Sequence, residues 1–86
     1  MSKVQIYTTA TCAFCVAAKM LLKQKGLDYE EIRVDTDPQR WEEMMARTKR
    51  RSVPQIIIGE RVIGGYEELA AAARSGELDG AAGGAT

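Results

Sequence analysis

The sequence of 86 residues contains no histidine, and Cys12 and Cys15 are its only cysteines. Without histidine, the chain has neither a Cys-His nucleophile pair nor a histidine general base. Two cysteines alone also fall short of the four ligands of a structural zinc site within one chain. Activation of a thiol must therefore come from backbone dipoles and cationic side chains.

An excess of one charge and long apolar runs are also missing. Twelve basic and twelve acidic residues cancel, and the pI is about 6.2, which argues against a protein that binds nucleic acid. No apolar run approaches the roughly 18 residues of a membrane span, and residues 1–4 lack the apolar core of a signal peptide. We therefore expect a cytoplasmic protein, in a reducing compartment that favours catalytic over structural cysteines.

The most informative feature present is a Cys-x-x-Cys pair between an apolar run, residues 4–7, and a helix-like run, residues 16–22. At a helix start, Cys12 lies near free N–H groups and the positive end of the helix dipole, which stabilise a thiolate. Cys15 follows at i+3, on the same face and within disulfide reach. This placement predicts redox chemistry, because so short a disulfide loop stabilises little as a structural element.

The first third of the chain predicts a βαβ unit. Residues 3–8 form an apolar, β-branched strand, and the helix after it stops at Gly26. Thr11 or Cys12 is placed to cap that helix. Residues 29–34 alternate apolar and charged positions, which predicts a second strand parallel to the first.

A second helix is predicted by Asp37 as N-cap and Pro38 at the first helical position. Its apolar stripe has the i, i+3, i+4, i+7 spacing of a helix, and we interpret it as core packing. The stripe consists of Trp41, Met44, Met45 and Thr48.

The remaining chain predicts a hairpin, a helix and a tail. Residues 55–58 and 61–63, joined by a tight turn, predict antiparallel strands, and residues 66–75 predict an alanine-rich helix. The order β-α-β-α-β-β-α predicts an α/β protein that resembles the minimal thioredoxin fold, a four-stranded mixed sheet flanked by three helices. We expect one domain over residues 1–78 and a flexible tail over residues 79–86.

Three short motifs occur in order between about Val4 and Leu78. They are Tyr7-Thr8-x-x-x-Cys12-x-x-Cys15, then Ser52-Val53-Pro54-Gln55-Ile56, then Gly64-Gly65 followed by an acidic residue. In this combination the chain resembles the glutaredoxins, specifically the small dithiol class of bacterial type. The resemblance implies a glutathione-dependent thiol–disulfide oxidoreductase that acts on glutathionylated or disulfide-bonded proteins. It implies glutathione as co-substrate, no metal, no nucleic-acid or membrane partner, and a monomer.

The resemblance also assigns roles to residues. Cys12 matches the attacking cysteine and Cys15 the resolving one, while Pro54 matches a cis-proline beside the site. The main chain of Val53 would pair with the cysteinyl part of glutathione, and residues 65–67 match the turn that receives its γ-glutamyl end. The implied glutathione-binding set is Thr11, Phe14, Arg40, Ser52, Val53, Pro54, Gly65, Tyr66 and Glu67.

Several positions depart from the family pattern. Thr9 stands where a lysine is frequent, so we expect Arg40, ahead of the run 49–51, to meet the glycine carboxylate of glutathione. Tyr66-Glu67 replaces a small residue and Asp, and Tyr66 packs either over the ligand or over the hairpin. Ala13-Phe14 replaces the common Pro-Tyr, which restores a backbone N–H and exposes an aromatic ring to partners.

Two other functions stay open at this stage. In one, two chains share a [2Fe–2S] cluster through Cys12 of each chain and two glutathione thiols. The missing motif proline allows this function, although the commoner carrier motif Cys-Gly-Phe-Ser is absent. In the other, a flavoenzyme replaces glutathione as the reductant, which favours a Trp-Cys-Gly-Pro-Cys motif that the chain lacks.

Overall fold

A computed structural model describes residues 3–76, and these residues form a four-stranded sheet with three helices. The predicted fold is therefore confirmed, whereas the predicted tail, residues 79–86, lies outside the described residues. Within residues 3–76, no helix is long and apolar enough to cross a membrane. The elements in chain order are β1 (Val4–Thr8), α1 (Ala13–Gln24), β2 (Glu30–Arg33), α2 (Pro38–Thr48), β3 (Gln55–Ile58), β4 (Arg61–Gly64) and α3 (Tyr66–Ser75).

The strands lie in the order β2-β1-β3-β4. As predicted, β1 pairs with β2 in parallel, and β3 with β4 antiparallel. The central strands β1 and β3 are also antiparallel, with Tyr7 opposite Gln55. This pairing brings the end of β1 next to the start of β3, so the loop before Cys12 lies beside Val53 and Pro54.

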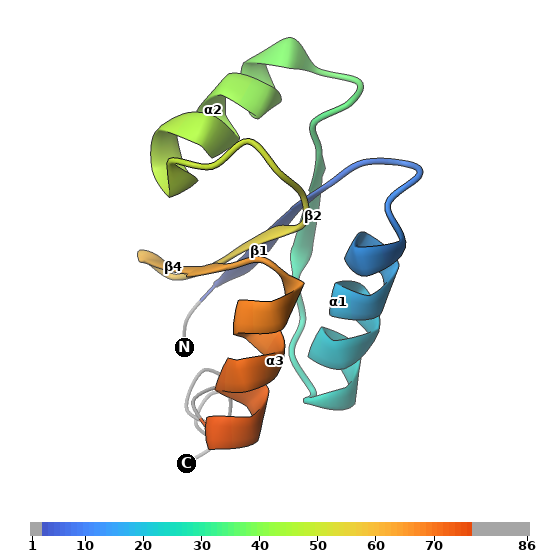
Figure 1. The fold of residues 1–86 in the computed structure, drawn as a ribbon, viewed down its shortest axis with the longest axis vertical. Helices are drawn as coiled ribbons and strands as arrows, with labels where there is room; N and C mark the ends of the chain where they lie inside the picture. Colours follow the sequence, from blue (N-terminus) through green and yellow to red (C-terminus); the bar gives the residue numbers. More distant parts are fainter. Residues whose placement is uncertain (1–2, 77–86) are drawn as a thin grey trace.

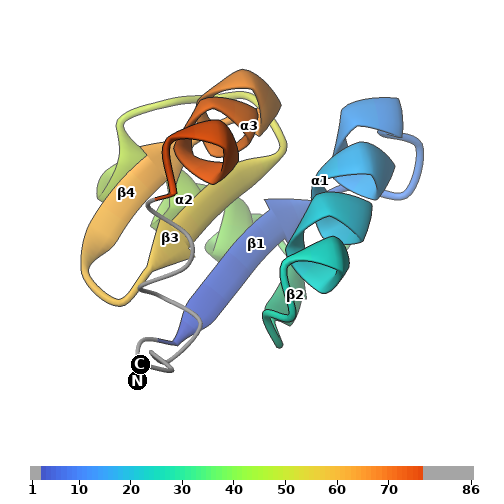
Figure 2. The ribbon, with the colours of Figure 1, turned by 90° about the horizontal axis from the view of Figure 1, so that it is seen from below.

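The helices cover both faces of the sheet. Helices α1 and α3 lie side by side on one face, and α2 lies on the other (Figures 1 and 2). Because side chains alternate along a strand, Ile6 packs toward α1 and α3 while Tyr7 packs toward α2. The predicted core role of the α2 stripe is confirmed for Met44, which is buried, and for Trp41, which packs against the same cluster.

Local signals in the sequence explain where the helices begin and end. Asp37 Oδ1 accepts a hydrogen bond of 3.0 Å from the Gln39 N–H, as expected of an N-cap. Of the two predicted caps for α1, Cys12 is the observed one. Gly26 and Gly76 follow α1 and α3 at φ +74° and +84°, a region that glycine enters without steric cost.

Candidate active site

Cys12 occupies the N-cap of α1, at the edge of the sheet where β1 ends. Its Sγ accepts a hydrogen bond of 3.1 Å from the Cys15 N–H, so the first turn of the helix already directs a donor at the sulfur. As a thiol, the same Sγ lies 3.7 Å from the Val53 carbonyl oxygen, to which it donates. Cys12 is half-buried, and a substrate can reach it.

Cys15 lies one turn into the helix and is only 1% exposed. Burial, together with the hydrogen bond to Cys12, raises the pKa of the Cys15 thiol from 9.0 to about 12. Both cysteines are free thiols in this structure. The protein therefore presents one accessible sulfur, with a second, protonated thiol behind it.

The loop that leads into Cys12 is held by Asp35, which follows β2. Asp35 Oδ2 accepts a hydrogen bond of 3.0 Å from the Ala10 N–H, and its carboxylate pairs with Arg33 at 2.8 and 2.7 Å. The pair with Arg33 keeps the pKa of Asp35 well below its ordinary value. This contact was not predicted from the sequence, although the ends of neighbouring parallel strands lie together by necessity.

The segment opposite Cys12 carries a cis peptide bond between Val53 and Pro54, as the family resemblance implied. Gln55, fully buried, donates from Nε2 to the Ser52 carbonyl oxygen at 2.9 Å and to Ser52 Oγ at 3.2 Å. These bonds fold the segment back on itself. They fix the main chain that presents the Val53 carbonyl to Cys12.

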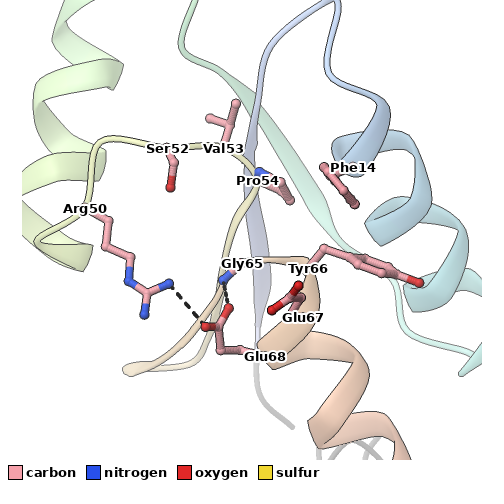
Figure 3. Close-up of a pocket in the computed structure, with 9 residues that line it drawn as sticks. All are labelled: Phe14, Arg50, Ser52, Val53, Pro54, Gly65, Tyr66, Glu67 and Glu68. Carbon is pink, nitrogen blue, oxygen red and sulfur yellow. Dashed lines mark hydrogen bonds and ion pairs between the residues drawn. The ribbon is translucent and has the colours of Figure 1, made fainter.

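A cavity of about 220 Å³ opens beside this segment, between the loop after α2 and the start of α3 (Figure 3). Two residues of the predicted glutathione-binding set do not line it: Thr11 is exposed in the loop before Cys12, and Arg40 pairs with Glu43 on α2 at 2.9 Å. The two cysteines are not in the lining either, and Cys12 contacts it through Val53. Seven predicted residues come together in the lining. They are Phe14, Ser52, Val53, Pro54, Gly65, Tyr66 and Glu67.

Two further residues in the lining, Arg50 and Glu68, were not in the predicted set. Glu68 Oε1 accepts a hydrogen bond of 2.8 Å from the Gly65 N–H, and Glu68 Oε2 lies 3.5 Å from Arg50 Nη1. Backbone N–H groups of Glu68 and Gly65, with Arg50 nearby, lower the pKa of Glu68. The Gly-x-x-Glu spacing is a capping signal that makes Glu68 predictable, and Arg50 lies in the cationic run ranked behind Arg40.

Glycine is required at position 64, where the backbone passes close to the Glu68 side chain. Gly64 has a φ of +114°, which side chains rarely adopt, and a Cβ there would lie 3.2 Å from Glu68 Cγ. The close approach of Gly64 and Gly65 to Glu68 lets the carboxylate reach the Gly65 N–H. The Gly-Gly motif thus shapes the cavity wall through its backbone.

An aromatic pair forms one rim of the cavity. Phe14 is 63% exposed, and its ring centroid lies 5.9 Å from that of Tyr66, with 33° between the planes. Tyr66 thus packs against the first turn of α1, beside the cavity. This contact joins α1 and α3 next to the two cysteines.

The charges in the cavity are of both signs. Arg50 supplies a cation on one side, and Glu67 and Glu68 supply carboxylates on the other (Figure 3). Glu67 makes no hydrogen bond or ion pair with any residue of the described range, so its carboxylate is available to a ligand. The arrangement suits a small zwitterionic molecule that reaches toward Cys12.

A metal site within the described residues is not indicated. No three His, Cys, Asp or Glu side chains gather there to hold an ion. A cluster shared by two chains takes a single cysteine, Cys12, from each of them and is not tested by this observation. That alternative stays a prediction.

The sequence is similar to known proteins over most of its length. A family model described as glutaredoxin matches residues 4–63. A glutaredoxin of Pseudomonas aeruginosa is 46% identical over 79 residues, which cover 92% of this chain and 94% of the relative. Glutaredoxin 3 of Escherichia coli K12 is 43% identical over 79 residues, which cover 92% of this chain and 95% of that protein.

Solved structures show the same architecture. The solution structure of glutaredoxin from Brucella melitensis superposes with a TM-score of 0.81 at 40% identity, covering 93% of this chain and 87% of that one. A buckwheat glutaredoxin–glutathione complex gives a TM-score of 0.83 at 25% identity, covering 93% and 76%.

Proposed function

The chain belongs to the glutaredoxin family of thiol–disulfide oxidoreductases, and on this basis we propose that it reduces mixed disulfides between proteins and glutathione. One observation carries the proposal: the accessible Cys12 caps the N-terminus of α1 and donates a hydrogen bond to Val53, which lines a cavity with charges of both signs. Cys15, buried and protonated, is unsuited to make the first attack.

The proposed reaction is two successive exchanges at Cys12. The Cys12 thiolate attacks the glutathione sulfur of the mixed disulfide, a Cys12–glutathione disulfide forms, and the protein leaves as a thiolate that takes up a proton. The thiolate of a second glutathione then attacks the glutathione sulfur bound to Cys12. Glutathione disulfide leaves, and the electron pair of the broken bond restores the Cys12 thiolate.

With a protein disulfide as substrate, Cys15 provides the second step. After Cys12 has formed a mixed disulfide with the protein, Cys15 loses its proton and attacks the Cys12 sulfur. An internal Cys12–Cys15 disulfide forms as the protein is released, and two glutathione molecules reduce it. The i+3 spacing keeps Cys15 within reach of Cys12 for this step.

We place glutathione in the cavity by its charges. The Glu67 carboxylate would bind the ammonium group, and Arg50 would bind a carboxylate of the tripeptide. The main chain at Val53 would pair with the cysteinyl part, next to Cys12. A cavity of about 220 Å³ with this pattern supports the placement, as does the similarity to a solved glutaredoxin–glutathione complex.

The test of the activity is a coupled assay with glutathione and a glutathionylated protein. We expect Cys12→Ser to lose essentially all turnover, and Cys15→Ser to retain turnover of the mixed disulfide but lose reduction of protein disulfides. Cys12→Ser activity at the wild-type level would overturn the assignment. Turnover with thioredoxin reductase in place of glutathione would point to the flavoenzyme-linked alternative.

The glutathione placement is tested separately by comparing two cations. We expect Arg50→Gln to raise the KM for the glutathionylated substrate about three- to tenfold, because a charge-assisted hydrogen bond is lost. Arg40→Gln is the matched control and should leave KM unchanged, since Arg40 pairs with Glu43 outside the cavity. The reverse result would restore Arg40 as the carboxylate partner.

A further inference from the structure

A second hollow, of about 290 Å³, lies between α1 and α3 and leads away from the cysteines. The two helices run side by side in the same direction (Figure 1). Tyr66 lines both this hollow and the cavity at the active site, so the two are neighbours. We call the hollow the α1–α3 groove. It is lined by Leu21, Lys25, Tyr66, Ala70, Ala73 and Arg74.

The far end of the groove is basic. Among residues 3–76, the side chains of Lys25 and Arg74 have no ion-pair or hydrogen-bond partner. The chain has no acidic residue between Ala10 and Leu27, although its net charge is zero. Within the described part of the chain, two cations without an acidic partner thus lie beyond the apolar residues of the groove, a pattern that complements an acidic, partly apolar ligand.

We propose that the α1–α3 groove binds the polypeptide of a substrate protein on one side of its target cysteine. The groove would select substrates that place an acidic residue at its basic end, next to Lys25 and Arg74. The inference rests on the function proposed above and adds a substrate class to it. The basic residues lie too far from Cys12 to serve glutathione, whose charges are matched by Glu67 and Arg50. A polypeptide spans that distance.

The geometry fixes the position of the acidic residue. Lys25 is thirteen positions beyond Cys12, so at about 1.5 Å per residue the helix carries it roughly 20 Å from the sulfur. An extended chain covers that distance in about six residues. Small side chains, Ala70 and Ala73, line the groove between the two ends and leave room for apolar side chains of the substrate.

The test uses four glutathionylated peptides. Each carries either Asp or Lys, placed six residues from the cysteine on either its N-terminal or its C-terminal side. We expect the wild-type protein to reduce one Asp peptide with a KM about five- to tenfold below that of its Lys counterpart. The double variant Lys25→Glu/Arg74→Glu should reverse this preference. Lys23→Glu is the matched control, because Lys23 is exposed on α1 but does not line the groove.

The mixed disulfide of glutathione and cysteine serves as a small substrate in the same assay. All folded variants should reduce it equally, because it is too short to reach the groove, and circular dichroism verifies their fold. If the protein reduces this small substrate but shows the same KM for the Asp and Lys peptides, the groove proposal is overturned and the proposed function stays intact. Failure to reduce it would count against the proposed function itself.

Two other occupants of the groove are also distinguished by experiment. Sedimentation of a wild-type dimer that the double variant dissociates would assign the groove to a second copy of the chain and overturn the proposal. A variant ending at Gly76 should show the same peptide preference as the full chain. A preference that emerges only in this shortened variant would assign the groove to residues 77–86.

Discussion

Cys12 and Cys15 are three residues apart yet lie in different surroundings. Cys12 is an N-cap with a substrate-accessible sulfur, whereas Cys15 faces the core and is almost fully buried. Burial disfavours the charged form of Cys15 and raises its pKa to about 12. The division of labour between nucleophile and resolving thiol therefore follows from one turn of helix.

This difference predicts selective alkylation. At pH 7 we expect iodoacetamide to modify Cys12 at least about tenfold faster than Cys15, because the thiolate is the reactive species and Cys15 stays a thiol. Peptide mapping by mass spectrometry of the reduced protein measures both rates. The two cysteines should react alike once the chain is unfolded in urea, and similar rates in the folded protein would contradict the prediction.

Glu68 is a second residue whose role can be separated by matched substitutions. Its Oε1 accepts from the Gly65 N–H at 2.8 Å and caps α3. Glu68→Ala should lower the free energy of unfolding by about 1 kcal/mol, while Glu68→Gln keeps an acceptor and should stay within about 0.5 kcal/mol of wild type. Urea denaturation followed by circular dichroism measures both, and equal losses would show that the cap is not the cause.

At the scale of elements, the site is assembled from connections rather than from any one helix or strand. The loop after β1, the segment before β3 and the turn before α3 meet at one end of the sheet (Figures 1 and 3). The antiparallel pairing of β1 with β3 places the first two side by side. Helix α1 contributes Cys12 at its N-terminus, and the loop that follows α2 contributes Arg50.

The N-terminus of α2 offers a test of an element that lies away from the chemistry. Asp37→Ala removes the side-chain acceptor of the Gln39 N–H and should cost about 1 kcal/mol of unfolding free energy. Asp37→Asn retains an acceptor and should cost a few tenths of a kcal/mol at most. Urea denaturation compares them. Turnover of the cysteine–glutathione mixed disulfide should be unchanged in both, and a loss would link α2 to catalysis.

At the scale of the whole molecule, carboxylates make side-chain contacts between different elements. Glu31 accepts from Thr8 at 2.7 Å and from Lys19 at 3.0 Å, and Glu43 accepts from the buried Tyr7 hydroxyl. The Thr8 and Tyr7 hydrogen bonds, with nearby cations, lower the pKa values of Glu31 and Glu43 below the ordinary 4.5. Each carboxylate therefore favours the folded state in its charged form.

The expected consequence is a loss of stability in acid. Because these folded-state pKa values are lowered, the stabilisation is fully present above pH 4.5 and disappears as the pH falls through the folded-state values. The urea midpoint should thus decrease steadily below pH 4.5. Glu43→Gln should flatten part of this decrease, and a midpoint independent of pH in that range would contradict the prediction.

At high pH, stability is expected to fall as the pH rises, because the pKa of Cys15 is raised rather than lowered in the folded state. The pKa of Cys15 is raised from 9.0 to about 12, so stability is unaffected below pH 9 and falls as the pH rises from there toward 12. Tyr7, whose pKa burial also raises, adds to the loss above pH 10. Urea midpoints of the reduced protein between pH 8 and 11 should fall less steeply in Cys15→Ala than in wild type; equal slopes would contradict the shift at Cys15.

Much of this molecule was predictable because its signals are local. The Asp37-Pro38 start of α2, the glycine stops of α1 and α3, and the strand alternation that separates Ile6 from Tyr7 each depend on a few neighbouring residues. The Cys-x-x-Cys pair is equally local.

The remaining features depend on contacts between distant segments. Arg40 pairs with Glu43 of its own helix, whereas Arg50, two residues after α2, lines the cavity and lies near Glu68 of α3. The pairing of β1 with β2 was predicted, but the hydrogen bond from the Ala10 N–H to Asp35 depends on how the loops after these strands lie, which no periodicity encodes.

The sequence by itself determined the redox chemistry, since the placement of Cys12 and Cys15 indicates a redox pair and the absence of histidine leaves backbone dipoles and cationic side chains to activate a thiol. The tertiary structure decided how the thiols differ and what surrounds them: the burial of Cys15, the charges around the cavity and the α1–α3 groove. The physical reason is that chemistry follows from residue type and local spacing. Burial and electrostatic complementarity arise only when separate elements pack.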